Sequence, residues 1–144
     1  MERHQALNNA TKPRSGVKVV ELGTLIAGPF AARILAEFGA EVIKIESPDG
    51  GDPLRKWRKL YEGTSLWWFV QARNKQSLTL NLKHPDAIVI LKQLLSEADI
   101  LIENFRPGVL EKLGLGWDVL HALNPKLVMV RLSGFGQSGP MQGQ

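Results

Sequence analysis

Short runs of β-branched and aliphatic residues alternate with amphipathic stretches along most of the chain, from residue 17 onward. This alternation is typical of βαβ units around a mainly parallel sheet. The clearest helix is predicted over 85–98, where apolar residues recur at spacings of three and four. The other predicted elements are strands at 17–22, 41–45, 77–82, 99–103 and 127–132, helices at 30–38, 107–113 and 117–123, and a helical turn at 65–73.

The order of these elements predicts an α/β fold with a doubly wound, mainly parallel sheet, whose ligands bind beyond the carboxyl ends of the strands. Residues 1–16 are polar and carry both charges, and we expect them to form a flexible tail ahead of one domain over 17–144. The stretch 47–64 is rich in Gly, Pro and Asp and has no clear periodicity, so it is predicted to be a long loop.

Composition excludes several classes of protein. The 144 residues are 44% hydrophobic and 22% charged, as in a soluble globular domain, and the absence of cysteine excludes disulfides and thiolate metal sites. The apolar runs are far shorter than the ~20 residues that cross a bilayer, so we expect a cytoplasmic protein with no membrane contact. The histidines are scattered, so no metal site is predicted. The net charge of +4 suits an anionic partner.

Two glycine-rich segments follow predicted strands. Residues 134–139 fit the pattern G-x-G-x-x-G, but Pro140 follows where a dinucleotide-binding fold needs a helix, which disfavours a dinucleotide site. Residues 23–28 join a predicted strand to a predicted helix. They fit either an anion site at the helix N-terminus or a plain tight turn, and spacing alone leaves both interpretations open.

Three further features also have two interpretations each. The basic cluster 55–59 contains Trp57 and fits either phosphate binding or a solvated loop, and no base-reading element supports nucleic-acid binding. The pair Trp67 and Trp68 is more typical of a core or a subunit interface than of a ligand platform. Asn104 follows a predicted buried strand, where it either contacts a ligand or caps the helix that begins near residue 107.

Eight segments are shared, in order and spacing, with one known family. They are 16–22 (GVKVVEL), 27–30 (AGPF), 39–46 (GAEVIKIE), 51–52 (GD) with Arg55, 74–75 (NK), 103–108 (ENFRPG), 113–114 (LG) and 133–140 (SGFGQSGP). Together they resemble the class III coenzyme A transferases, the group of formyl-CoA transferase and carnitine-CoA transferase. The resemblance covers nearly everything after the tail.

The resemblance implies a Rossmann-like domain that binds CoA, in a homodimer of interlocked chains. The family moves CoA from an acyl-CoA to a free carboxylic acid through an aspartyl-CoA thioester, with backbone N–H groups of glycine-rich loops stabilising the oxyanions. CoA is then a substrate, and no cofactor or metal is implied. By position, the family's CoA contacts fall on Ile26, Ala27, Leu80, Asn81, Lys83, Asn104, Phe105, Arg106 and Lys112, and its glycine loop on Gly134, Gly136 and Gly139.

The sequence departs from the family pattern in two respects. Ile26 and Ser47 stand where formyl-CoA transferase has glutamine and arginine, which argues against formyl-CoA or oxalate as substrate. The family's nucleophilic aspartate lies beyond residue 144, and none of the aspartates at 49, 52, 86, 99 or 118 matches it.

We therefore expect 17–144 to be the N-terminal part of a CoA-binding domain, truncated before the catalytic aspartate and inactive alone. The alternative is a non-catalytic module that binds CoA or a nucleotide. A sheet that lacks its usual neighbours exposes apolar surface, so we also expect self-association or a marginal fold.

Overall fold

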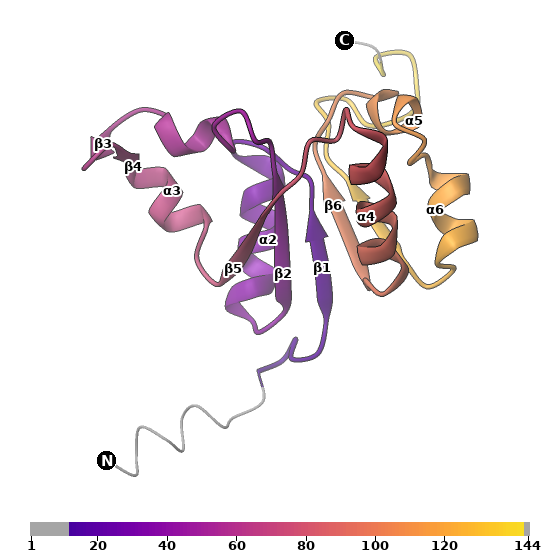
Figure 1. The fold of residues 1–144 in the computed structure, drawn as a ribbon, viewed down its shortest axis with the longest axis horizontal. Coiled ribbons are helices and arrows are strands. Elements are labelled where there is room, and N and C mark those ends of the chain that lie inside the picture. The colour runs from indigo at the N-terminus through magenta and orange to yellow at the C-terminus, as the bar shows by residue number, and fades with distance from the viewer. Residues whose placement is uncertain (1–11, 143–144) are drawn as a thin grey trace.

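Five parallel strands form the central sheet of the computed structural model, which describes residues 12–142 (Figure 1). Their order across the sheet is β5-β2-β1-β6-β7. The chain runs outward from β1 to β5 and then returns to β6 on the other side of β1, so the direction of the crossovers reverses between β1 and β6. The strands are β1 (Lys18–Glu21), β2 (Glu41–Glu46), β5 (Lys75–Thr79), β6 (Ile100–Glu103) and β7 (Val128–Arg131).

Helices cover both faces of the sheet, which confirms the doubly wound α/β prediction. Neighbouring residues of β1 point to opposite faces. Val19 packs with the alanines of α2, whereas Val20 packs with Leu91 and Leu95 of α4. The helices are α2 (Ala27–Glu37) on one face, and α4 (Pro85–Ser96), α5 (Val109–Lys112) and α6 (Trp117–Leu123) on the other.

A small unit interrupts the alternation between β2 and β5, and it projects to one side of the sheet in Figure 1. It contains the 3-10 helix η1 (Pro53–Lys56), the hairpin strands β3 (Leu60–Tyr61) and β4 (Thr64–Ser65), and helix α3 (Leu66–Gln71). The prediction of a structureless loop over 47–64 is therefore wrong in part. Strands of two residues are too short to show a period of two in the sequence.

The bounds of two elements, α2 and β5, differ most from those predicted. Helix α2 begins at Ala27 rather than at residue 30, since Pro29 lies in the first turn, where a missing N–H costs no hydrogen bond. Strand β5 begins and ends earlier than 77–82. Its first residue, Lys75, is polar yet buried in an ion pair, which hides the start of the strand, and a turn at Asn81 follows its end.

Two further expectations concerned a flexible tail over residues 1–16 and the absence of a membrane-spanning segment. Of the predicted tail, residues 1–11 lie outside the described part, whereas Arg14 donates a backbone hydrogen bond of 2.9 Å to the carbonyl of Phe38. Between residues 12 and 142, no helix is both long and apolar enough to cross a membrane.

Candidate functional site

A cavity of about 340 Å³ lies at the carboxyl ends of the strands, where the crossovers reverse. Segments that follow β1, β2, β5 and β6 line it, together with α5. Four of the residues predicted as ligand contacts line this cavity: Leu80, Asn81, Lys83 and Phe105. Its other lining residues are five apolar ones, Leu22, Ile45, Leu82, Val109 and Leu113, and four polar or acidic ones, Thr24, Glu46, Ser47 and Asp49. The fold thus brings together two predicted segments that are more than 20 residues apart in sequence.

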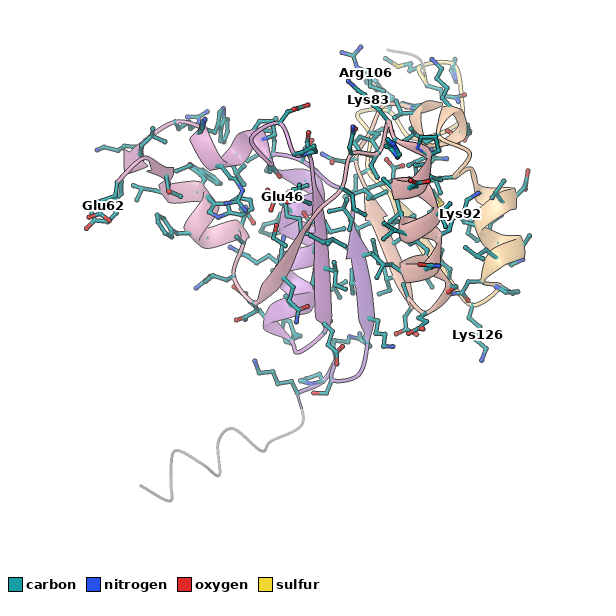
Figure 2. The ribbon with its side chains drawn as sticks, in the orientation of Figure 1. Glu46, Glu62, Lys83, Lys92, Arg106 and Lys126 are labelled. Atoms are coloured by element: carbon teal, nitrogen blue, oxygen red, sulfur yellow. The ribbon has the colours of Figure 1, made fainter. Side chains whose placement is uncertain are left out.

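Cationic side chains lie at the same end of the molecule as the cavity. Lys83 and Arg106 are both exposed there, as Figure 2 shows. Lys112, at the end of α5, is exposed as well but does not line the cavity. An apolar cavity with cations near its opening suits a ligand that has both an apolar part and anionic groups.

Asn104 joins the segment after β6 to the turn after β1. Its Oδ1 accepts a hydrogen bond of 2.7 Å from the backbone N–H of Thr24, and its Nδ2 donates one of 3.0 Å to the carbonyl of the same residue. The N-cap of α5 is Gly108. The interpretation of Asn104 as a helix cap is therefore wrong, and its partner lies 80 residues away in the sequence.

The turn over 23–28 is tight, and its own chain satisfies part of its backbone. A Cβ on either Gly23 or Gly28 would lie 2.7 Å from the Cα of the other, so the close approach requires both glycines. Thr24 N–H is bonded to Asn104, and Leu25 N–H donates a hydrogen bond of 3.1 Å to Asp52 Oδ1. Ile26 and Ala27, the two predicted contacts here, follow as exposed residues at the start of α2 and do not line the cavity.

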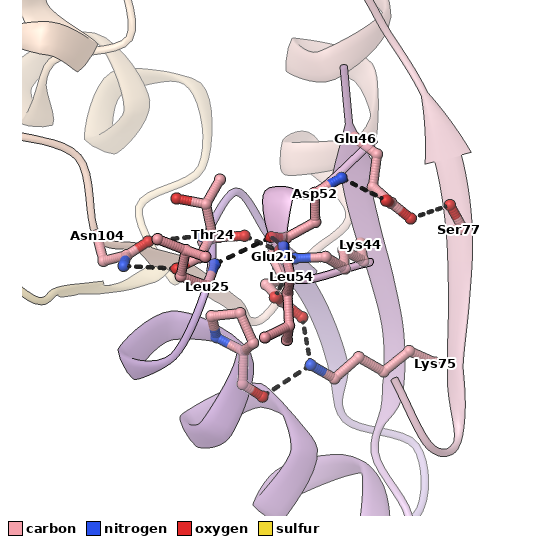
Figure 3. Close-up of polar contacts among 12 residues, drawn as sticks. Glu21, Thr24, Leu25, Lys44, Glu46, Asp52, Leu54, Lys75, Ser77 and Asn104 are labelled. Carbon is pink, nitrogen blue, oxygen red and sulfur yellow. Dashed lines mark hydrogen bonds and ion pairs between the residues drawn. The ribbon is translucent and has the colours of Figure 1, made fainter. Parts of the chain in front are cut away.

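Beneath this turn lies a buried cluster of two lysines and two acids (Figure 3). Lys44 Nζ is 2.7 Å from Glu21 Oε1, 2.8 Å from Asp52 Oδ2 and 2.6 Å from the carbonyl oxygen of Gly23. Lys75 Nζ is 2.7 Å from Glu21 Oε2 and 2.7 Å from the carbonyl oxygen of Pro29. Burial lowers the pKa of Lys75, and the nearby Glu21 opposes this shift. The paired charges hold the turn onto β2 and β5.

Three strands of the sheet end in a buried glutamate: Glu21, Glu46 and Glu103. Glu46 accepts hydrogen bonds from Arg55 Nε at 2.7 Å and from the backbone N–H of Asp52 at 2.9 Å. Burial alone would raise the pKa of Glu46, but the hydrogen bonds, above all that from Arg55, lower it to about 2.

Glu103, like Glu46, accepts hydrogen bonds from the backbone of the segment that follows its strand and from an arginine. Its carboxylate accepts 2.7 Å hydrogen bonds from the backbone N–H of Phe105 and from Arg131 Nε, and Arg131 also pairs with Glu111 of α5. These glutamates were not among the predicted site residues. Their signal in the sequence is a glutamate at the end of a predicted buried strand, after two apolar residues in VVE and LIE and after one in KIE.

The basic cluster 55–59 is used in part for packing. Arg55 makes a two-pronged ion pair with Glu46, and its guanidinium lies 3.8 Å from the ring centre of Trp68. Arg58 lies over Trp57, which packs edge-on against Trp67. These contacts leave Arg55 with a structural role. Trp67 is 42% exposed and so is not a core residue, and its place in a subunit interface stays a prediction.

The predicted glycine loop is not part of the cavity. Gly134, Gly136 and Gly139 follow β7 in bends and turns, where Ser133 Oγ donates a 2.9 Å hydrogen bond to the carbonyl of Gly136. No helix follows β7 up to residue 142, although a dinucleotide fingerprint needs one. Within the same described range, no group of three or more His, Asp or Glu side chains is arranged to hold a metal ion.

Comparison with known proteins identifies the family. The model described as CoA-transferase family III matches residues 15–144. The chain belongs to CoA-transferase family III. It is 55% identical over 130 residues to the succinyl-CoA–D-citramalate CoA-transferase of Chloroflexus aurantiacus, and 39% identical over 140 residues to the human succinyl-CoA:glutarate CoA-transferase. These alignments cover 90% and 96% of this chain but 32% of each relative.

Solved structures of two other proteins have a similar fold. A CAIB/BAIF family protein from Brucella suis has a TM-score of 0.87 at 37% identity, over 94% of this chain and 37% of its own. Rv3272 from Mycobacterium tuberculosis has a TM-score of 0.86 at 38% identity, over 94% of this chain and 38% of its own. The chain therefore spans about a third of the length of the relatives it matches.

Proposed function

We propose that this chain provides the CoA-binding part of an enzyme that transfers CoA from an acyl-CoA to a free carboxylic acid. The observation that carries the proposal is the 340 Å³ cavity, which Leu80, Asn81, Lys83 and Phe105 line together. These residues come from two segments on which the resemblance to the class III enzymes places CoA contacts. Membership of CoA-transferase family III supports the reaction class.

The chemistry of CoA fits the surroundings of the cavity. The adenine and pantetheine groups would contact the apolar lining, and the phosphates would pair with Lys83, Arg106 and Lys112. Two acids line the cavity, Glu46 and Asp49. Glu46 is paired with Arg55, so it repels an anionic ligand less than a free carboxylate would, and Asp49 is exposed, so solvent screens its charge.

The proposed reaction proceeds through covalent intermediates. An aspartate outside this chain attacks the acyl-CoA carbonyl, which gives an acyl anhydride and a CoA thiolate. The thiolate then attacks the aspartyl carbonyl, which releases the first acid and leaves an aspartyl-CoA thioester, and the second acid reverses these steps. Backbone N–H groups of the loop at Gly134, Gly136 and Gly139 would stabilise the oxyanions. The full enzyme would be a cytoplasmic homodimer, and this chain alone would bind CoA without turnover.

The relatives also suggest the substrate class. The names of those from Chloroflexus aurantiacus and from human join succinyl-CoA with D-citramalate or glutarate. We extend this class, dicarboxylic acids, to the acids exchanged here. The departures at Ile26 and Ser47 from the formyl-CoA transferase pattern support this choice over formate or oxalate.

Calorimetric titration of the chain with CoA, NAD and ADP tests the proposal. We expect CoA to bind with a dissociation constant on the order of micromolar, more tightly than NAD or ADP, and no CoA exchange from succinyl-CoA to glutarate by mass spectrometry. Lys83→Ala should weaken CoA binding about tenfold, because it removes a phosphate contact. Lys126→Ala, which removes an exposed cation away from the cavity, should not (Figure 2).

Each contrary result has a separate meaning. Failure of CoA to bind would refute the proposed site. Equal affinity for NAD and CoA would favour the alternative of a general nucleotide-binding module. Turnover by the purified chain would show that the reaction does not need an aspartate beyond residue 144.

A further inference from the structure

The motif residues Gly51, Asp52 and Arg55 do not line the 340 Å³ cavity, although they belong to the segments shared with the family. Asp52 is 2% exposed and lies between the turn after β1 and helix η1. Its Oδ1 accepts hydrogen bonds from the backbone N–H of Leu25 at 3.1 Å and of Leu54 at 2.8 Å. Its Oδ2 lies 2.8 Å from Lys44 Nζ. One carboxylate thus ties two segments that are 27 residues apart to a buried cation.

The backbone of Asp52 is itself fixed to the end of β2. Glu46 Oε2 accepts its N–H at 2.9 Å (Figure 3). The same oxygen also pairs with Arg55. Gly51 has a φ of +76°, and a Cβ there would lie 2.6 Å from the same carboxylate oxygen. The segment therefore requires glycine next to the aspartate, because only glycine permits both this conformation and this close approach.

Leu25 needs such a restraint. Its φ of 60° is left-handed, which costs a residue with a side chain about 1–2 kcal/mol. The residue before it, Thr24, lines the cavity and is held by Asn104. The residues after it, Ile26 and Ala27, begin α2. The conformation of Leu25 thus sets how the chain passes from the cavity wall into the helix.

We propose that Asp52 is a positioning residue for CoA binding. It does not contact the ligand, but it holds Leu25 in the left-handed conformation and so fixes Thr24, Ile26 and Ala27 relative to the cavity. Lys44 pairs with Oδ2 of this carboxylate at 2.8 Å and so fixes its orientation. The inference rests on the proposed function, because it concerns the affinity for CoA.

The decisive variant is Asp52→Asn. Asparagine has the same size, but its amide NH2 is a donor. If the amide oxygen faces Leu25 and Leu54, the NH2 group faces the ammonium group of Lys44, and if the oxygen faces Lys44, the NH2 group faces the two backbone donors. Either arrangement sets donor against donor and disturbs the contact that holds Leu25. We expect CoA to bind about tenfold more weakly, a loss of about 1.4 kcal/mol, and the amide proton of Leu25 to exchange with solvent at least about tenfold faster. The matched control is Asp118→Asn, which makes the same charge change on the exposed surface of α6 and should alter neither measurement.

A second substitution separates positioning from general stabilisation. Glycine adopts positive φ at little cost. Adding Leu25→Gly to Asp52→Asn should therefore restore part of the affinity lost by Asp52→Asn, with Leu25→Gly alone as the reference. A variant that only destabilised the fold would unfold at lower urea concentration yet bind CoA normally while folded. That outcome, or a double variant as weak as Asp52→Asn, would overturn the proposal.

Amide exchange of Leu25 still tests the positioning role if CoA does not bind to the unsubstituted chain or if Asp52→Asn does not fold. If the unsubstituted chain does not bind CoA, the proposed function fails, and unchanged exchange of Leu25 in Asp52→Asn would overturn the positioning role as well. If Asp52→Asn does not fold, the unsubstituted chain still gives an answer. Leu25 should exchange as slowly as Leu22, whose N–H donates a 2.8 Å hydrogen bond to Ile102, and fast exchange would overturn the proposal.

Discussion

Glu46 illustrates how one buried side chain makes stability depend on pH. Its pKa is about 2 in the folded chain and 4.5 in the ordinary, solvated state, since Arg55, Ser77 and the backbone of Asp52 donate to the ionised carboxylate. The unfolded chain therefore takes up a proton at higher pH than the folded chain. The stabilisation is fully present above about pH 4.5 and is lost as pH falls toward 2.

Glu46→Gln should remove this part of the pH dependence. Each pKa unit corresponds to about 1.4 kcal/mol, so the free energy of unfolding of the unsubstituted chain should lose on the order of 3 kcal/mol more than that of the variant as pH falls from 6 to about 2. Urea unfolding at a series of pH values measures this. Glu62→Gln, on the exposed hairpin in Figure 2, should keep the full dependence. Parallel curves for Glu46→Gln and the unsubstituted chain would contradict the prediction.

Single residues also mark the limit of prediction from sequence. The pattern places Asn104 and Glu46 at the ends of buried strands, but it does not give their partners. Asn104 binds Thr24, 80 residues away, and Glu46 binds Ser77, 31 residues away. Such pairs depend on which strands become neighbours in the sheet. Leu80, Asn81, Lys83 and Phe105 of the cavity lining were predicted through the family resemblance, whereas the buried charges that hold the cavity walls were not.

At the scale of elements, the turn between β1 and α2 gives a direct test of close packing. Gly23→Ala should lower the free energy of unfolding by about 1–3 kcal/mol, because the new methyl group would meet the backbone of Gly28 at 2.7 Å. Urea unfolding measures the effect. Gly134→Ala is the control, since nothing lies within 4 Å of its Cβ position. Equal free energies of unfolding for the two variants would show that the turn accommodates the new methyl group without loss of stability.

The elements that were located well share a strong apolar pattern. Helix α4 begins at the predicted residue 85, and the predicted strands at 99–103 and 127–132 contain β6 and β7, because each has a continuous or periodic buried face. In the unit over 53–71, α3 lies within the predicted helical turn 65–73, but helix η1 and the hairpin were missed. Its strands have two residues each, and it depends on single contacts such as that of Ser65 Oγ with the carbonyl of Trp57 at 2.7 Å. Local patterns do not reveal contacts of this kind.

At the scale of the whole molecule, the unit between β2 and β5 exposes a group of apolar side chains. Leu60 and Tyr61 of the hairpin and Leu66, Trp67, Phe69 and Val70 of α3 are each at least 40% exposed. Exposed apolar patches of this kind often mark contacts with another protein surface. We therefore expect this unit to mediate self-association of the isolated chain.

Light scattering after size-exclusion chromatography measures this. The apparent mass of the unsubstituted chain should rise with concentration, and Phe69→Lys should reduce that rise because it places a charge in the patch. Val119→Lys, at an exposed position of similar accessibility on α6, serves as the control. A monomeric mass at all concentrations would refute the expectation.

The strand order also has a consequence for synthesis of the chain on the ribosome. The central strand, β1, is made first, but β6, its neighbour on one side, emerges about 80 residues later. Glu21 and Asp52 can form their ion pairs with Lys44 and Lys75 once residue 75 has emerged. Glu103 can pair with Arg131 only after residue 131 has emerged. The half of the sheet formed by β1, β2 and β5 can therefore assemble with its buried charges already neutralised, while the nascent chain still lacks the other half.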